Sequence, residues 1–588
     1  MINKLFRQML LTQILSSMTV TLCMLIDSIM IGRFLGVDAM TAYGLASPVL
    51  LVFAALGCLI SAGVQVVCGR TMGAGDKEQT NACFTASVAL TFGVSLIGML
   101  VVLLFTDQIT TLLCSGEHAA DKEVFELTKD YLRGFIIGAP AFISAQVMVP
   151  YMQMSGSQVR LITAVALMTV GDVVFDVLNV FVVKQGTFGM GLASSLSYYI
   201  AFIIGIAYFF KKDCLFRIRP KLLTRRVCMR LVRDGIPMLI NQMSLVLLTF
   251  VFNTMLLHLS GKYAVAAYSV ISTAGNICYA FSSGVAAVAL TLSSIFYGDA
   301  DRSALKRLVR IMSFYAVAVC AAVTAVVLIV ADPLVTLFLT DMDAKAMAVS
   351  GFRLFVLSLV PCALNTSFKN YYQGIERVGY TMLISVFQNF ALPALNAFIL
   401  SRFMGVTGVW LGFVTGETVT LLCITVFVFV KNHRFAVCSE SFAMLPEDFG
   451  VRDEDCFELS ITDPVQVVEA SEKSEEFCMS RGIPHRLSSQ IALCIEEMSN
   501  NIVMHGFTEK QRRRQAREHS IDLRVMIKDD STVIRIRDNC RNFDPVKYME
   551  LHQTDDPMAH IGIRMVMKMV KNANYVNSLG LNNLTLTL

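Results

Sequence analysis

Charged residues are scarce in this chain, and the scarcity is confined to one part of it. Asp, Glu, Lys and Arg make up 16% of the 588 residues, whereas soluble globular proteins carry about 25%. Residues 1–435 consist mainly of long apolar runs, while residues 440–588 resemble an ordinary soluble domain. The composition therefore excludes a single soluble domain and indicates a membrane part followed by a soluble part.

Several signals that point to particular functions are also missing. The net charge is only +4, which argues against nucleic acid as a partner. The sixteen cysteines lack metal-ligand spacing and often lie in apolar runs, so we interpret them as small hydrophobic residues in a reducing compartment. The chain contains no P-loop motif, which argues against a primary pump of the Walker type. No small-residue cleavage site follows the first apolar stretch, so we expect a membrane helix there rather than a signal peptide.

Twelve stretches of the first part are long and apolar enough to cross a membrane, which takes about 20 residues. They lie near 9–32, 43–69, 83–106, 130–155, 160–183, 188–210, 234–258, 263–296, 311–331, 350–373, 379–401 and 406–430. Basic residues gather in alternate breaks, above all in segment 211–233, which holds nine Lys and Arg residues. By the positive-inside rule these breaks and both termini are cytoplasmic. We therefore expect a multi-pass protein of the cytoplasmic (inner) membrane of a bacterium.

The membrane part repeats itself. Asp76 recurs as Asp301 and Tyr43 as Tyr268, each 225 residues later. Six helices occurring twice are expected to enclose a site at the middle of the membrane, as in secondary transporters. The predicted organisation is an N-terminal six-helix lobe (1–210), a basic inter-lobe segment (211–233), a C-terminal six-helix lobe (234–434), a connector (435–455) and a cytoplasmic domain (456–588).

A few ionisable residues interrupt the apolar spans, at a cost of about 2.5–3.5 kcal/mol or more each. Asp27 lies late in the first span, and Asp172 and Asp176 lie four residues apart on one face of the fifth. Such acids suit exchange of a proton or binding of a cation, and we favour this reading over helix bridging. Glu417 is a weaker candidate. Asn253 is a neutral polar residue of the kind that commonly bridges helices.

The soluble part alternates between strand and helix patterns. Strands are expected at 456–461, 521–528, 532–538 and 584–588, helices near 464–481, 486–505 and 561–571, and a polar loop runs from 538 to 560. This order predicts an α+β sandwich with helices on one face of a mixed sheet. Glu497, Asn501 and His505 share one stripe of the second helix, where an amide and a carboxylate can hold hydrated Mg²⁺. Asp538 ends a strand and can accept a hydrogen bond from an adenine amino group. Each of these residues taken alone is equally well a solvated polar residue.

Residues 1–435 resemble the multidrug and toxic compound extrusion transporters. The resemblance rests on the segments 27–33 (DSIMIGR), 72–77 (MGAGDK) and 189–193 (GMGLA), on their order and on their twofold recurrence. It implies an all-α membrane body of twelve helices that exports organic cations or drug-like compounds in exchange for Na⁺ or H⁺.

The same resemblance assigns roles to individual residues. Asp27 matches the family's acid in helix one and Asp176 its acid in helix five, and both would bind the coupling cation or substrate. Asp172 stands where the family has Asn. Asn253 is the counterpart of Asp27 in the second half, and Asp172 and Asn253 are counted with Asp27 and Asp176 as cation- or substrate-binding residues. The family's helix-one proline is replaced by Leu11, which puts models based on bending at that proline in doubt.

Residues 456–588 resemble the ATP-binding domain shared by histidine kinases, gyrases and, most closely, anti-sigma-factor serine kinases. The motifs are 497–506 (EMSNNIVMHG), 538–545 (DNCRNFDP) and 560–564 (HIGIR). They imply the histidine-kinase-type ATPase fold and binding of Mg-ATP.

Carried over to this chain, the resemblance makes Glu497 the catalytic base, Asn501 the Mg²⁺ ligand and Asp538 the adenine contact. His505, Phe543 and Gly562 complete the predicted nucleotide site, with Gly562 in the lid. Glu496 and Asn500 give an alternative register. Cys540 and His560 stand where the family has glycine, and a side chain there can obstruct the nucleotide.

Three functions agree with these patterns. The first is a multidrug-type antiporter regulated by a nucleotide-binding tail. The second is a membrane-anchored signalling serine kinase that uses the transporter body as a sensor, so enzyme activity is left open. The third is a lipid-linked precursor flippase, which is disfavoured because the membrane spans carry acids rather than Lys or Arg. The expected partners are a small organic cation or amphipathic substrate, the lipid bilayer and a cytoplasmic regulatory protein that docks on the tail.

Overall fold

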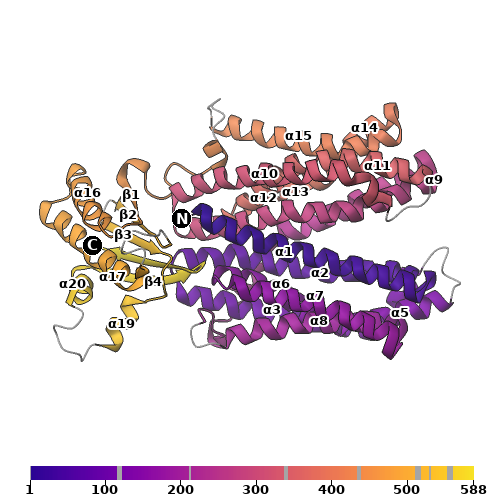
Figure 1. Ribbon diagram of the computed structural model, residues 1–588, viewed down its shortest axis with the longest axis horizontal. Helices are drawn as coiled ribbons and strands as arrows, with labels where there is room; N and C mark the ends of the chain where they lie inside the picture. The colour runs from indigo at the N-terminus through magenta and orange to yellow at the C-terminus, as the bar shows by residue number, and fades with distance from the viewer. Residues whose placement is uncertain are drawn as a thin grey trace.

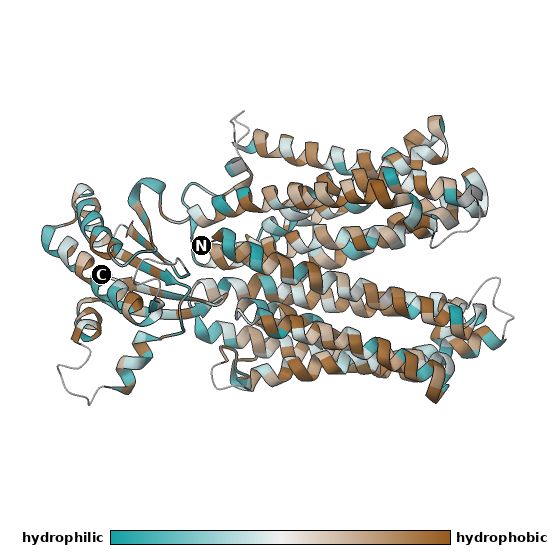
Figure 2. Ribbon diagram, in the orientation of Figure 1, coloured by the Kyte–Doolittle hydropathy of each residue, from teal (hydrophilic) through white to brown (hydrophobic). Residues whose placement is uncertain are grey.

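The computed structural model describes residues 2–114, 122–210, 214–336, 342–432, 439–509, 518–528, 531–552 and 561–588. The chain forms a long bundle of helices with a small α+β domain at one end (Figure 1). Apolar residues dominate the bundle helices, while hydrophilic residues are concentrated in the small domain (Figure 2). We call the bundle end beside the C-terminal domain the near end and the opposite end the far end.

The first half of the bundle follows the order expected from the apolar runs. Its helices are α1 (Ile2–Met30), α2 (Val37–Gly73), α3 (Lys77–Leu104), α4 (Thr106–Leu113), α5 (Lys122–Ile136), α6 (Ala139–Met154), α7 (Gln158–Leu178) and α8 (Gly186–Phe209). One turn of π-helix continues α1 (Ile31–Leu35) and another continues α7 (Asn179–Val183).

The second half repeats this arrangement. It contains α9 (Arg225–Gly298), α10 (Arg302–Thr336), α11 (Met342–Leu357), α12 (Leu359–Gly374), α13 (Val378–Val386), a π-helical turn (Phe387–Ala391), α14 (Leu392–Met404) and α15 (Val406–Asn432). The backbone of α9 leaves helical geometry at Gly261, where φ is 65°, so α9 supplies two spans. Glycine tolerates this left-handed conformation.

The number of spans agrees with the prediction. Among the described residues, ten helical segments are long and apolar enough to cross a membrane. Two helix pairs, Lys122–Ile136 with Ala139–Met154 and Lys345–Leu357 with Leu359–Gly374, pass the same test together and are bent by 49° and 46°. Counting each bent pair as one span gives the twelve expected.

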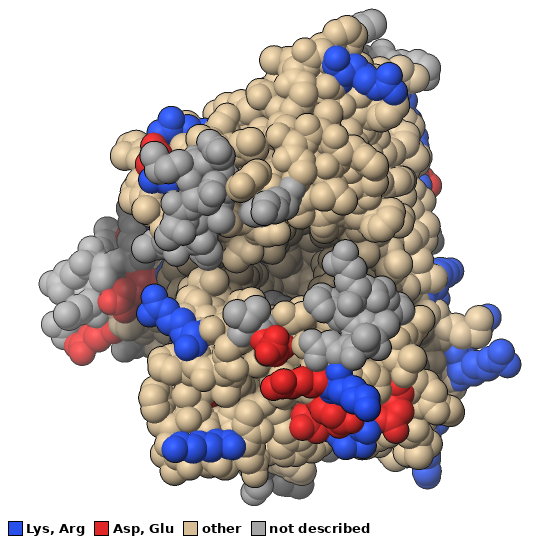
Figure 3. All heavy atoms as spheres, turned by 90° about the vertical axis from the view of Figure 1, so that its right-hand side faces the viewer, with Lys and Arg blue, Asp and Glu red and all other residues tan. Residues whose placement is uncertain are grey.

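The two halves are packed backbone against backbone at the near end. Gly73 and Gly298 are related by the 225-residue repeat. A Cβ atom added to Gly73 would lie 2.0 Å from the Ile295 carbonyl oxygen, and one added to Gly298 would lie 2.0 Å from the Arg70 carbonyl oxygen. Only glycine permits this approach. Arg70 also forms an ion pair with Glu376 of the second half. At the far end, by contrast, the surface is hollowed between the halves (Figure 3).

The C-terminal domain is a five-stranded sheet with helices on one face. Its elements are β1 (Cys456–Ile461), α16 (Gln466–Ser480), α17 (His485–Gly506), β2 (Ile521–Lys528), β3 (Ser531–Asp538), α19 (Pro545–Leu551), α20 (Ile561–Met569), β4 (Asn572–Ser578) and β5 (Leu581–Thr587). The strand order is β1-β2-β3-β5-β4, and every pair is antiparallel. The predicted mixed sheet is therefore wrong, because each strand runs opposite to every strand it pairs with.

Two elements of this domain escaped the prediction. The strand β4 (sequence NANYVNS) contains three asparagines, which are depleted in strands. The helix α19 lies within the predicted polar loop. It begins at Pro545, and the Asp544 side chain accepts hydrogen bonds from the Val546 and Lys547 amides. Both features are typical of a helix start.

The core of the domain follows from alternation along the central strands. Leu523 and Val525 of β2 and Ile534 and Ile536 of β3 are fully buried in the cluster formed with α16 and α17. Residues between them point to the opposite face, which lies toward the bundle (Figure 1). The apolar face of the sheet thus carries the helices, and the polar face meets the membrane part.

The connector packs along the second half of the bundle. The Phe442 ring stacks on Phe368 with centroids 4.8 Å apart, and Phe449 stacks on Tyr297 at the same distance. The Tyr372 hydroxyl donates a hydrogen bond to the Phe442 carbonyl oxygen at 3.1 Å. Residues 439–450 therefore belong structurally to the bundle surface.

We predict that a chain ending after Gly450 inserts into the membrane and elutes as a single species after extraction. A chain ending after Asn432 should melt at a lower temperature, because it loses both aromatic contacts, with an expected cost of about 2 kcal/mol or more. Thermal unfolding of the two chains in the same detergent measures this difference. Degradation of the longer chain, or equal melting of both, would contradict the assignment.

Candidate functional site

The three acids predicted from the sequence lie together inside the first half of the bundle. Asp27 on α1 is 8% exposed, and Asp172 and Asp176 on α7 are 2% and 0% exposed. Asp172 and Asp176 both lie within electrostatic range of Asp27, and Asp172 lies within electrostatic range of Asp176. The four-residue spacing places Asp172 and Asp176 on the side of α7 that faces α1, as expected for one helix face.

The acids have too few hydrogen-bond donors around them. The Ser194 hydroxyl donates to Asp27 Oδ2 at 3.2 Å. Asp27 Oδ1, Asp172 Oδ2 and both oxygens of Asp176 are buried without a hydrogen-bond partner among the described residues. An unpaired buried carboxylate costs several kcal/mol. The cluster is therefore chemically suited to take up protons or a cation.

Three tyrosines that the sequence analysis did not assign to the site lie close to this cluster. Tyr43, Tyr131 and Tyr198 are within electrostatic range of Asp27. The rings of Tyr43 and Tyr131 make an edge contact with centroids 5.4 Å apart. Aromatic faces attract organic cations, so the tyrosines extend the chemistry that the acids offer. The signal for these tyrosines in the sequence was the recurrence of Tyr43 as Tyr268.

A second polar cluster lies in the other half of the bundle and is built around Glu417 on α15. Glu417 is 9% exposed. The Asn365 side chain donates to Glu417 Oε2 at 2.7 Å, and the Gln388 side chain donates to Oε1 at 3.3 Å. Unlike the three acids, this carboxylate has a donor on each oxygen.

Lys369 on α12 lies beside this cluster and overturns one expectation. The prediction that the spans carry acids rather than Lys or Arg is wrong here, because Lys369 is only 2% exposed. Its Nζ donates to Asn241 Oδ1 at 2.5 Å, and Asn389 donates to the same oxygen at 2.7 Å. The long apolar stem can pack among apolar neighbours while the amino group reaches a polar partner.

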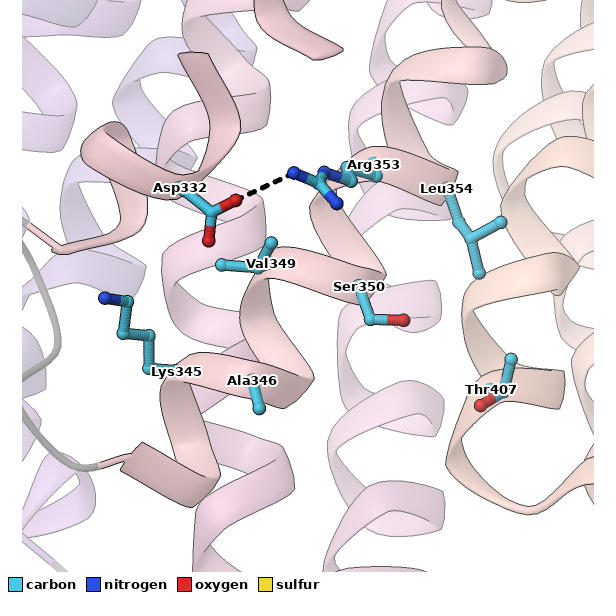
Figure 4. Close-up of a pocket in the computed structure, with 8 residues that line it drawn as sticks. All are labelled: Asp332, Lys345, Ala346, Val349, Ser350, Arg353, Leu354 and Thr407. Carbon is cyan, nitrogen blue, oxygen red and sulfur yellow. Dashed lines mark hydrogen bonds and ion pairs between the residues drawn. The ribbon is translucent and has the colours of Figure 1, made fainter. Parts of the chain in front are cut away.

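Asn253 lies on α9, in the second half, whereas the acid cluster belongs to α1 and α7. Its buried Oδ1 has no hydrogen-bond partner within the described part of the chain. A separate pocket of about 660 Å³ opens on the second half at α10, α11 and α15 (Figure 4). In it Arg353 donates to Asp332 at 2.7 Å. The predicted site residues do not line this pocket.

The predicted nucleotide residues gather around α17 of the C-terminal domain. Glu497 and Asn501 are half-buried and His505 is exposed. Gly562, at the start of α20, lies directly on Glu497, because a Cβ atom added to Gly562 would lie 2.1 Å from Glu497 Oε2. Of the alternative register, Glu496 is half-buried and Asn500 is exposed.

Asp538 ends β3 inside a hydrogen-bond network. It is 4% exposed, and its Oδ1 accepts hydrogen bonds from the Asn582 side chain at 2.9 Å and from the Cys540 amide at 2.8 Å. Asn582 in turn accepts a hydrogen bond from the Tyr575 hydroxyl at 2.7 Å. Burial raises the pKa of the Asp538 carboxyl, although these two donors act in the opposite direction. A carboxylate held this rigidly can recognise one donor group.

The two departures from the glycine pattern have different outcomes. Cys540 packs against Gly506 at the end of α17, since a Cβ atom on Gly506 would lie 2.7 Å from Cys540 Cβ. The missing side chain at Gly506 therefore accommodates the extra one at Cys540. His560 lies outside the described residues. Phe543 is 44% exposed, and its ring lies 5.3 Å from that of Tyr548.

Comparison with known proteins divides the chain in the same way. The MatE family model matches residues 13–178 and 237–399, and the model of the histidine kinase-like ATPase domain matches residues 461–588. The multidrug export protein MepA of Staphylococcus haemolyticus is 24% identical over 408 residues, which cover 68% of this chain and 86% of that protein. MepA of Staphylococcus aureus strain MSSA476 is 23% identical over 406 residues, or 68% and 87% of the two chains.

Solved structures share the fold of the bundle. A MATE protein in complex with MaL6 and an outward-facing multidrug resistance MATE family transporter of the MOP superfamily each give a TM-score of 0.68 at 22% identity. Each match covers 72% of this chain and 94% of the other.

We predict that Asn241→Leu destabilises the bundle by about 2–3 kcal/mol, because the buried Lys369 amino group loses its acceptor. Asn241→Asp keeps an acceptor oxygen and should stay within about 1 kcal/mol of the unaltered protein. Thermal unfolding in detergent compares the two variants. Equal melting of both would show that Lys369 does not depend on Asn241.

Proposed function

The chain belongs to the MatE family of membrane transporters, and on this basis we propose that it exports organic cations or drug-like amphipathic compounds in exchange for Na⁺ or H⁺. Its C-terminal histidine kinase-like ATPase domain binds nucleotide and regulates export. We place the near end in the cytoplasm of a bacterium, because the described part of the basic inter-lobe segment leads into the near end of α9.

The observation that carries this proposal is the acid cluster with four unpartnered carboxylate oxygens. Three buried acids cannot all remain charged without compensation. A proton or Na⁺ and a cationic substrate both supply the missing positive charge. Since they compete for the same oxygens of Asp27, Asp172 and Asp176, arrival of one favours departure of the other. That competition is what an exchanger needs.

The shape of the bundle supports export. Close backbone packing at Gly73 and Gly298 closes the near end, and the surface is hollowed at the far end (Figure 3). This is the arrangement of the outward-open state of a transporter whose halves rock around a central site. Helix α1 begins at the near end, so Asp27, close to its last residue, lies in the far half. The acids therefore lie on the side from which an external ion enters.

Lys369 is the one observation that favours the flippase alternative, because a buried cation can hold phosphate. Its charge is offset by Glu417, which lies within electrostatic range of it. The second half therefore offers no excess of positive charge at this cluster, and organic cations are the better substrate class.

Several residues of the ATPase domain support the proposed nucleotide binding. The fixed Asp538 carboxylate can accept the adenine amino group, Asn501 would hold Mg²⁺ and Gly562 would belong to the lid. His505 and Phe543 would complete the nucleotide site. Glu497 stands on the same helix face as Asn501 and would act as the base if a phosphoryl group is transferred. This arrangement favours a serine kinase activity as a second role of the domain.

We predict that Asp27→Asn and Asp176→Asn each lower gradient-driven uptake of tetraphenylphosphonium into inside-out vesicles by at least about 10-fold. Removing a charge from the hydrocarbon region eases insertion, so the loss would report function. Asp107→Asn, at an acid that is 64% exposed and pairs with Lys129, is the matched control and should transport normally. Unchanged uptake in both cluster variants would refute the cation site.

We predict that the full-length protein in detergent binds Mg-ATP and that Asp538→Ala weakens binding by about 10-fold or more. The adenine amino group would lose its acceptor in a closed site, at a cost of about 1–3 kcal/mol. Glu497→Ala should leave binding unchanged, because a base acts in the chemical step. Calorimetric titration measures both variants. The absence of heat with ATP, ADP and GTP for the intact protein would contradict nucleotide binding and leave protein docking as the role of the domain.

A further inference from the structure

The ATPase domain is joined to the bundle by buried charges. Arg535 Nη2 lies 2.8 Å from Asp299 Oδ1, and Arg537 Nη2 lies 2.8 Å from Asp299 Oδ2. Arg524 and Arg535 both pair with Asp301. The side chains of Asp299, Asp301, Arg524 and Arg535 are 6–8% exposed. The two aspartates form the turn between α9 and α10.

These charged side chains pair with one another and have little contact with water. Arg524 and Arg535 stand directly opposite each other on β2 and β3, a placement that is unfavourable for like charges. The two aspartates offset this repulsion, and Glu458 adds a further ion pair to Arg524 at 3.4 Å. Burial by itself raises the pKa of the Asp301 carboxyl, but Arg524, Arg535 and Arg537 outweigh it and hold the pKa well below its usual range. The face of the sheet is thus built to receive this turn.

One row of cross-strand neighbours runs across the whole sheet, and residues at both ends of this row contact the bundle. The row is Glu458, Arg524, Arg535, Thr585 and Asn574, from β1 to β4. At one end, Glu458 accepts a hydrogen bond from the Ser303 hydroxyl at 2.5 Å and pairs with Arg307, both on α10. The strands β1, β2 and β3 therefore hold the second half of the bundle.

The other end of the row holds the first half. The Asn574 side chain on β4 donates to the Gly75 carbonyl oxygen, after α2, at 3.3 Å. In the turn between β4 and β5, the Leu579 amide donates to the Met154 carbonyl oxygen at 2.6 Å. Gly156 lies against the same turn, since a Cβ atom there would lie 2.4 Å from the Gly580 nitrogen. A single hydrogen-bonded sheet thus spans both halves of the bundle.

We propose that the ATPase domain is a clamp that holds the near ends of the two halves together and stabilises the state open at the far end. This inference rests on the proposed transport function. Separation of the near ends, which the opposite state requires, must break the contacts of β1–β3 or those of β4–β5, because the sheet itself is continuous. The clamp therefore adds its binding energy to the closed near end.

The nucleotide site lies at the seam of this clamp. Asp538 ends β3, the strand that carries Arg535 and Arg537, and it pairs with Asn582 on β5. The predicted adenine contact thus joins the strands that hold one half of the bundle to those that hold the other. Nucleotide at Asp538 acts on the clamp through this joint, without touching the membrane helices.

The distance between the two halves at the near end tests the clamp. Val159 on α7 is 77% exposed, and a side chain added at Gly379 on α13 meets nothing within 4 Å. Keto-bearing residues introduced at these two positions can carry nitroxides, which leaves the native cysteines unlabelled. Electron–electron resonance then measures the separation of the halves in the full-length protein in lipid nanodiscs.

Intact protein should give one short distance. Arg535→Gln with Arg537→Gln, and separately Asp299→Asn with Asp301→Asn, should add a second population at longer distance, as should the chain ending after Gly450. A variant whose ATPase domain unfolds also loses the clamp, so the expected shift is the same. The control, Lys473→Gln with Arg486→Gln and Lys571→Gln, removes exposed cations of the same domain and should match the intact protein.

An unchanged distance in all three released forms would overturn the clamp, as would the same shift in the control. The measurement needs no transported substrate. If the intact protein does not transport but its released forms show the longer distance, the proposed function is refuted and the clamp stands. If the intact protein transports but its released forms keep the short distance, the clamp is refuted and the proposed function stands.

Discussion

Asp299 and Asp301 of the bundle form ion pairs with three arginines of the ATPase sheet, Arg524, Arg535 and Arg537. The contact between the membrane bundle and the ATPase domain depends on these ion pairs. Charges buried this deeply stabilise only when each is paired and well oriented, so the turn between α9 and α10 and the face of the ATPase sheet depend on one another. The turn belongs to one repeat of a twofold bundle, and the sheet reaches from there to the other repeat. A local electrostatic requirement thereby joins a membrane body to a soluble domain as one mechanical unit.

The internal repeat shows what this junction adds. Asp76 and Asp301 occupy equivalent positions and cap the helices that follow them, with oxygens that accept from the Gln79 and Ala304 amides. Among the described residues, Asp301 also pairs with Arg524 and Arg535 of the ATPase domain, whereas Asp76 pairs with no arginine of that domain. Both aspartates thus cap a helix of the bundle, and Asp301 in addition binds the ATPase domain. In the first half, the Gly75 carbonyl oxygen supplies the contact instead.

Much of this structure was predictable from local sequence patterns. Apolar runs predicted the spans, a four-residue spacing predicted the shared face of Asp172 and Asp176, and alternation predicted β2 and β3. The strand β4 and the helix α19 were missed for local reasons, whereas the misjudged buried charges depend on distant partners. Lys369 is buried because Asn241 lies beside it, and Arg524 and Arg535 occupy positions that alternation assigns to solvent. Their aspartate partners are more than 220 residues earlier in the chain, where no local pattern signals the contact.

We propose that the effect of nucleotide in the tail on the transport cycle passes through these ion pairs. It is tested most directly by the initial rate of organic-cation uptake into inside-out vesicles at a fixed ion gradient, with and without Mg-ATP. We expect Mg-ATP to change the rate of the intact chain and to leave unchanged that of the chain carrying both Asp299→Asn and Asp301→Asn. An equal response of the two chains to Mg-ATP, or no response of the intact chain, would contradict it.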